Sequence, residues 1–196
     1  MKKIPCLLQR EFYDNHTFRL LEDKITPGCE WVLNGEGVAT EKFDGTACMI
    51  LNGELYKRYD AKNGKQPPKG AIPCQNPDPI TGHYPHWVKV DKNKPEDKWY
   101  IEAWDKLCKQ SILYDKYIID ATFELCGPHF QGNPYNLDED VFFRHGDRVL
   151  PDIPRDIQGI KKYLEEHYIE GIVFHRRNES KDMCKIRRKD FGFNWN

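Results

Sequence analysis

The sequence contains no apolar run near the roughly 20 residues that a membrane-spanning helix requires. Its start, MKKIPCLLQREFYDN, has only a short apolar stretch between two lysines and Gln9, so we expect no secretory signal. The seven cysteines include no Cys-x-x-Cys pair and are odd in number, which favours reduced thiols over a disulfide framework. These absences predict a protein of the cytoplasm or the nucleus, neither secreted nor bound to a membrane.

An excess of either charge sign is also missing, because the formal net charge is −1. Global charge therefore indicates no particular class of partner. The local distribution is uneven: seven Lys and Arg residues lie between His175 and Lys189, against two acidic residues. A second basic segment runs from Lys57 to Lys69. Two basic segments on a nearly neutral protein predict a localised anionic ligand, although each segment could also be a solvated surface.

The composition is that of a polar globular protein, with 39% hydrophobic and 31% charged residues. Residues 60–87 contain six prolines and predict a long, irregular surface loop. An Asn-Gly pair at 52–53 predicts a hairpin, and apolar periodicity predicts helices over 97–111 and within 151–168. We expect one α+β domain over residues 1–196. Its predicted strands are 37–42, 46–51, 54–59, 117–127, 140–146, 170–175 and 183–188.

A charged stretch, EKFDGT, interrupts two of these strands and contains Lys42. A lysine amine attacks an electrophile only when it is neutral, so it must be desolvated or surrounded by other cations. Lys185 and Arg187 are alternate residues of a predicted strand, point to one face, and could supply those cations. Gly45 would allow a phosphate to approach closely. Without these accompanying residues, the simplest interpretation of Lys42 would be a solvated lysine in a turn.

Two glutamates lie at the ends of predicted strands, Glu124 in FELCG and Glu170 in EGIVF. Either could bind a ribose hydroxyl or a hydrated Mg²⁺ ion. Lys57 and Arg58, in the predicted hairpin, would add positive charge. The simpler alternatives are that Glu124 accepts a hydrogen bond from a backbone amide, that Glu170 caps a turn, and that the strand after residue 183 is a charged, solvated edge.

The motifs around these residues resemble those of the covalent nucleotidyltransferases, a superfamily of ATP-dependent DNA ligases, RNA ligases and mRNA capping guanylyltransferases. EKFDGT resembles motif I (K-x-D/H-G), TFELCGP motif III, EGIVF motif IV and CKIRRKDF motif V. The four matches occur in the family order and span about three quarters of the chain. The resemblance implies an ATP-grasp-like ligase domain of antiparallel sheets with flanking helices.

For the chemistry, the resemblance implies that Lys42 attacks the α-phosphorus of a nucleoside triphosphate and retains the nucleotide as a phosphoramidate. Lys185 and Arg187 would neutralise the α-phosphate in the transition state. Glu170 would help to hold the metal ion. Glu124 would contact the ribose or phosphate and could also serve the metal ion, which would be Mg²⁺ or Mn²⁺.

For the nucleotide, the resemblance implies that Glu41 lies at the edge of the purine base. Arg58 would contact the ribose or a phosphate. An aromatic residue would stack on the base, and Phe143 is the preferred candidate, with Phe142 and His145 as alternatives.

The sequence also departs from the family. DNA ligases and capping enzymes continue after motif V into an OB-fold domain, whereas here the sequence ends shortly after Phe191, so we expect no OB domain. Arg187 stands where lysine is commoner, and it still binds phosphate because arginine is always charged. The layout, with GFNW after motif V, looks most like the small single-domain 5′-to-3′ RNA ligases.

The sequence therefore predicts a monomeric, ATP-dependent RNA ligase that joins 5′-phosphate and 3′-hydroxyl ends through a lysyl-AMP intermediate. The segments 57–69 and 176–189 would bind the RNA backbone. The alternatives are a capping guanylyltransferase, a DNA ligase, and a nucleic-acid-binding module that has lost its chemistry.

Overall fold

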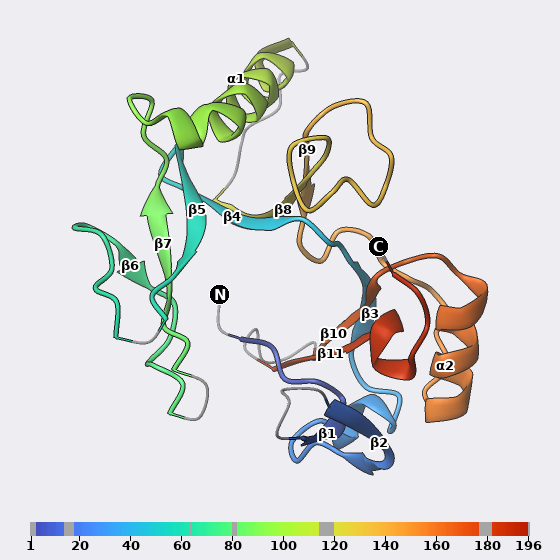
Figure 1. Cartoon of the computed structure of the whole chain (residues 1–196). Coiled ribbons are helices and arrows are strands. Elements are labelled where there is room, and N and C mark those ends of the chain that lie inside the picture. The colour runs from blue at the N-terminus through green and yellow to red at the C-terminus, as the bar shows by residue number, and fades with distance from the viewer. Residues whose placement is uncertain are drawn as a thin grey trace. The chain divides into compact units, whose positions relative to one another are not determined.

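The computed structural model describes residues 3–13, 18–62, 64–79, 82–113, 120–176 and 182–195. The chain forms two compact units (Figure 1). Unit 1 comprises Met1–Lys3 and Asp44–His145, and unit 2 comprises Ile4–Phe43 and Gly146–Asn196. Both contain mainly antiparallel sheet and a single α-helix among the described residues, which confirms the predicted α+β class. In the described part of the chain, no helix is long and apolar enough to cross a membrane.

Unit 1 is built on a six-stranded sheet in the order β6-β7-β5-β4-β8-β9 (Figure 1). Positive φ angles at Asn52 and Gly53 form the tight turn between β4 and β5, as the Asn-Gly pair predicts. Residues 117–119 of the predicted strand 117–127 lie outside the described residues, and β8 begins at Ala121. The strands are β4 (Thr46–Leu51), β5 (Glu54–Asp60), β6 (Ile72–Pro73), β7 (Pro85–Lys89), β8 (Ala121–Cys126) and β9 (Val141–Arg144).

The predicted loop 60–87 is partly wrong, because its last residues belong to a strand. β7 pairs with β5, so that Trp87 lies opposite Arg58 and is almost fully buried. Proline is tolerated at Pro85 because this residue is the first of the strand, where a missing N–H costs least. The density of prolines masked this strand in the sequence.

One face of the unit 1 sheet carries its hydrophobic core. Cys48, Ile50 and Leu125 are buried there, and helix α1 (Lys98–Leu113) contributes the buried Ala103. Trp99, Trp104 and Leu107 pack against the same cluster, as their helical spacing predicts.

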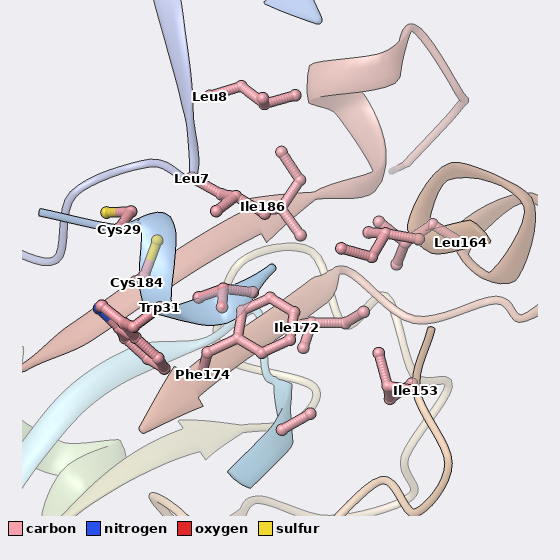
Figure 2. Packing of buried hydrophobic residues seen from close by; sticks show 13 residues of the cluster. Leu7, Leu8, Cys29, Trp31, Ile153, Leu164, Ile172, Phe174, Cys184 and Ile186 are labelled. Carbon is pink, nitrogen blue, oxygen red and sulfur yellow. The ribbon is translucent and has the colours of Figure 1, made fainter. Parts of the chain in front are cut away.

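Unit 2 contains a three-stranded sheet, β11-β10-β3, and a two-stranded sheet, β1-β2. The strands are β1 (Leu8–Phe12), β2 (Phe18–Ile25), β3 (Val38–Lys42), β10 (Gly171–His175) and β11 (Met183–Arg187). Figure 2 shows the core on one face of the larger sheet, where Ile172, Phe174 and Ile186 pack together. Helix α2 (Ile157–Glu166) contributes Leu164 to this cluster.

Helix α2 begins where a capping residue fixes its first turn. The Asp156 carboxylate accepts a hydrogen bond from the Gly159 N–H at 2.8 Å. Ile160 and Leu164, one turn apart, are completely buried, which confirms the predicted apolar face of this helix.

Candidate active site

The candidate active site in unit 2 lies on the face of the β11-β10-β3 sheet opposite its core. Gly171 of β10 pairs with Lys42 on one side and with Arg187 on the other, so these residues form one row across the sheet. Lys185, two residues before Arg187, projects from the same face. We call this the cationic face, defined by Lys42, Lys185 and Arg187. A Cβ atom on Gly171 would meet the Ile186 carbonyl oxygen at 2.3 Å, so only glycine allows this close strand pairing.

The Lys42 ammonium group forms an ion pair with the Glu170 carboxylate. It also donates a hydrogen bond to the Phe43 carbonyl oxygen at 3.1 Å. The Lys42 side chain keeps 22% exposure, against 5% for Glu170. Lys42 is therefore a partly accessible amine held by a buried carboxylate, which differs from a solvated turn lysine.

The environment of Lys185 disfavours the positive charge of its side chain. Burial lowers the pKa of its side chain to about 8, and the positive charges of Lys42 and Arg187 act in the same direction. Glu170 partly opposes them. A lowered lysine pKa, caused by burial and by nearby cations, is typical of sites that bind anions or transfer protons.

Arg187 is oriented by a residue that the sequence did not single out. Its guanidinium group donates to both oxygens of the Asp190 carboxylate, at 2.8 and 3.3 Å, and its backbone N–H donates at 2.9 Å. Arg10 donates to the same carboxylate at 2.7 Å. Burial would raise the pKa of Asp190, but the hydrogen bonds and charges of these two arginines outweigh it and hold the pKa below its usual value.

Glu41 lies on the opposite sheet face from Lys42, because it pairs with Ile172 of the core. Its carboxylate accepts a hydrogen bond from Arg148 at 3.1 Å, and the Arg148 guanidinium lies 5.2 Å from the centre of the Phe43 ring. The predicted role of Glu41 at a base edge stays a prediction. Arg148 lies outside every motif, and no pattern in the sequence indicated that it belongs to the site.

Three further predicted residues come together in unit 1. Lys57 lies opposite the core residue Cys48, so Arg58 points to the other face of the sheet. Glu124 and Phe143 are directly paired across β8 and β9 and project from that same face. The structure therefore places Arg58, Glu124 and Phe143 on one face, as a shared nucleotide-binding role requires.

Glu124 is held by two neighbours within unit 1, Gly45 and His145. One carboxylate oxygen accepts a hydrogen bond from the Gly45 N–H at 3.2 Å, which is the simpler role considered for this residue. The other lies 3.0 Å from Nε2 of His145, whose Nδ1 lies 3.0 Å from the Thr122 hydroxyl. His145, considered above only as a stacking residue, therefore orients Glu124.

Two expectations for unit 1 require correction. The close approach at Gly45 is made by the neighbouring strand, because a Cβ atom there would meet the Leu125 carbonyl oxygen at 2.4 Å. Lys57 is ion-paired with Asp97, whose side chain is completely buried, so its charge is already compensated within the fold. In contrast, Phe142 packs against the core, which leaves Phe143 as the better stacking candidate.

The basic segment 176–189 is less solvated than its charge predicts. Arg177 and Lys181 lie outside the described residues. Arg176 forms an ion pair with Glu36, and Arg188 donates hydrogen bonds to backbone carbonyls that include His167 at 2.9 Å. Several of these cations therefore stabilise unit 2, and Lys185 and Arg187 supply the charge of the cationic face.

The carboxylate near Lys42 could bind a divalent cation together with the phosphates of a substrate. Carboxylates are ligands that Mg²⁺ prefers, and Mg²⁺ is commonly held by one or two protein carboxylates together with substrate phosphates. Glu170, beside Lys42, offers one such carboxylate. In the described part of the chain, no group of three or more His, Cys, Asp or Glu side chains forms a complete protein cage for a metal.

Chemically, the cationic face combines a nucleophilic side chain with groups that bind anions. Such an arrangement suits phosphoryl or nucleotidyl transfer, in which negative charge increases on the phosphorus oxygens. The chain is distantly related to RNA ligases, as its motifs indicate.

The similarity covers nearly the whole chain. This chain is 25% identical to RNA ligase 1 of Rattus norvegicus, over 99% of this chain and 82% of the relative. It is 23% identical to RNA ligase 1 of Danio rerio over the same shares of both proteins. RNA ligase 1 of Pongo abelii is 24% identical, over 81% of this chain and 68% of the relative. No protein-family model matches the chain.

Proposed function

We propose that this protein is an ATP-dependent RNA ligase with the nucleotidyltransferase fold, which joins 5′-phosphate and 3′-hydroxyl ends. The observation that carries the proposal is the cationic face of unit 2, where Lys42, Lys185 and Arg187 project together and Glu170 binds the Lys42 ammonium group. The names of the relatives support RNA as the substrate.

In the first step, the Lys42 ammonium group loses one proton to solvent, and the resulting neutral amine attacks the α-phosphorus of ATP. A nitrogen–phosphorus bond forms as the bond to pyrophosphate breaks, and the nitrogen loses its remaining extra proton. The Glu170 carboxylate, which already accepts a hydrogen bond from Lys42, is placed to receive that proton. Lys185 and Arg187 stabilise the negative charge on the α-phosphate.

In the later steps, the RNA 5′-phosphate displaces Lys42 from AMP, and the 3′-hydroxyl of the second RNA end then displaces AMP. Glu124, Arg58 and Phe143 would bind the ribose, a phosphate and the base. A Mg²⁺ or Mn²⁺ ion held by Glu170, with Glu124 as a second candidate, would neutralise charge on the triphosphate. Each step exchanges one phosphorus bond for another, so no further reactant is required.

Labelling of the protein tests this proposal. The protein is incubated with ATP or GTP labelled at the α-phosphate and then separated by denaturing electrophoresis. We expect stable labelling by ATP, which Lys42→Ala abolishes and which Lys189→Ala, a change at an exposed lysine of the same unit, leaves intact. Labelling by GTP would indicate a guanylyltransferase instead, and binding of RNA with no labelling would indicate an inactive module.

Joining assays then test the substrate. Labelled protein is mixed with RNA or DNA strands that carry a 5′-phosphate and a 3′-hydroxyl. We expect joined RNA, whereas joining of DNA alone would contradict the assignment.

A further inference from the structure

The segment before β1 lies directly beside β11. The Lys185 N–H donates to the Pro5 carbonyl oxygen at 2.9 Å, and the Leu7 N–H donates to the Lys185 carbonyl oxygen at 2.7 Å. Cys6 and Lys185 form an isolated parallel bridge. Both backbone groups of Lys185 are thus bonded to a segment far from motif V in the sequence, so this segment is part of the structure that supports the cationic face.

Arg10 extends this connection to the side chains. It binds Asp190, which in turn binds Arg187, and the Asp190 side chain is completely buried. The Nε of Arg10 is itself buried and has no hydrogen-bond partner among the described residues. An unsatisfied buried donor costs stability. Local costs of this kind are concentrated at functional sites, so the position of Arg10 is better explained by function than by stability alone.

The charges of this group explain why two arginines share one carboxylate. If Arg187 alone were bonded to Asp190, the pair would be neutral and would stabilise only weakly the negative charge that increases on a phosphate during transfer. With Arg10 on the same carboxylate, the group retains one net positive charge. Asp190 can therefore fix the direction of the Arg187 guanidinium while positive charge is retained for an anionic ligand.

We propose that Arg10 is a positioning residue for nucleotidyl transfer: through Asp190 it holds Arg187 toward the α-phosphate and preserves the positive charge of the cationic face. The inference rests on the proposed function. Arg10 acts through Asp190 and Arg187, and its effect is therefore on the rate of transfer rather than on ATP affinity.

Kinetic comparison of three variants tests the role of the Arg10 charge. Arg10→Met keeps an unbranched side chain but removes the charge and the guanidinium group that lies over the Phe18 ring. Arg10→Lys retains the charge, and Arg19→Met removes an exposed arginine of the neighbouring strand. We expect Arg10→Met to lower kcat for self-adenylylation about tenfold, with KM for ATP changed less than about twofold. Arg10→Lys should recover most of the rate, and Arg19→Met should match the wild type.

Two kinetic results would overturn the proposal. One is equal kcat for Arg10→Met and Arg19→Met, and the other is equal loss in Arg10→Lys and Arg10→Met, which would make shape rather than charge responsible. Thermal unfolding identifies any variant that has lost its fold.

A nuclear magnetic resonance measurement separates this inference from the proposed function. The Nε–H of Arg187 donates to Asp190 and should exchange slowly with solvent in the wild type. We expect about tenfold faster exchange in Arg10→Met and near wild-type exchange in Arg10→Lys. If the wild type takes no AMP, the proposed function fails, whereas unchanged exchange in Arg10→Met shows that Arg10 does not position Arg187.

Discussion

Replacing Lys185 by methionine should make the protein more stable while it removes activity. In the wild type, burial and the charges of Lys42 and Arg187 lower the pKa of Lys185 from 10.5 to about 8. Methionine has a similar length and no charge, so it avoids the free-energy cost of holding a charged lysine at this buried position. Sites that bind and transform substrates commonly retain such destabilising groups.

The expected increase in the free energy of unfolding of Lys185→Met follows from the shift in the Lys185 pKa. One pKa unit corresponds to about 1.4 kcal/mol, so the shift corresponds to about 3 kcal/mol at pH 7. Partial exposure of the Lys185 side chain reduces this to about 2 kcal/mol. The folded protein disfavours the proton, so the unfolded chain binds more protons between pH 8 and 10.5. The wild type therefore gains stability relative to Lys185→Met as the pH rises through this range.

Urea unfolding of both proteins between pH 7 and pH 10.5, followed by circular dichroism, measures this difference. We expect Lys185→Met to exceed the wild type by about 2 kcal/mol at pH 7 and to lose most of that advantage by pH 10.5. Lys189→Met, at an exposed position, should stay within about 0.5 kcal/mol of the wild type. A Lys185→Met protein that is less stable at pH 7, or an advantage independent of pH, would refute this reasoning.

Three other predictions concern the remaining site residues. Glu170→Gln keeps an oxygen acceptor but loses the charge that pairs with the nucleophile, so single-turnover self-adenylylation should slow at least about tenfold; an unchanged rate would remove Glu170 from the first step. His145→Ala releases Glu124 and should raise KM for ATP several-fold with little change in melting temperature, whereas an unchanged KM would leave His145 a structural residue. Phe142→Ala should cost about 2 kcal/mol in urea unfolding and leave KM for ATP unchanged, whereas Phe143→Ala should raise KM for ATP; the reverse pattern in KM would exchange their roles.

Much of the fold follows from local patterns in the sequence. The Asn52–Gly53 turn and the helical spacing of Ile160 and Leu164 each depend on neighbouring residues, and the structure confirms both. Strand β7 was missed because its pairing with β5 depends on residues distant in sequence, while the prolines near it indicate a loop. Local patterns could not reveal a strand whose stability comes from a distant partner.

The candidate site was predictable in its motif residues but not in the groups that hold them. Strand alternation alone places Lys185 and Arg187 on one face, and the structure confirms it. Asp190 follows Arg187 by three residues, whereas Arg10 comes from β1, and the Arg10–Asp190 contact joins residues 180 positions apart. No local pattern in the sequence encodes such a contact.

The alternation rule also shows why Lys57 and Arg58 differ. The sequence presents them as one basic pair, yet adjacent strand residues point to opposite faces. Lys57 therefore pairs with the buried Asp97, and Arg58 lies over Trp87, 5.1 Å from the ring centre.

In the proposed mechanism, Lys42 becomes covalently linked to AMP. Intact-mass measurement after incubation with ATP and Mg²⁺, followed by peptide mapping, tests it most directly. We expect a mass gain of one adenylate, located on Lys42 and absent from Lys42→Ala. A wild-type protein with no added mass, or an adenylate on another residue, would contradict it.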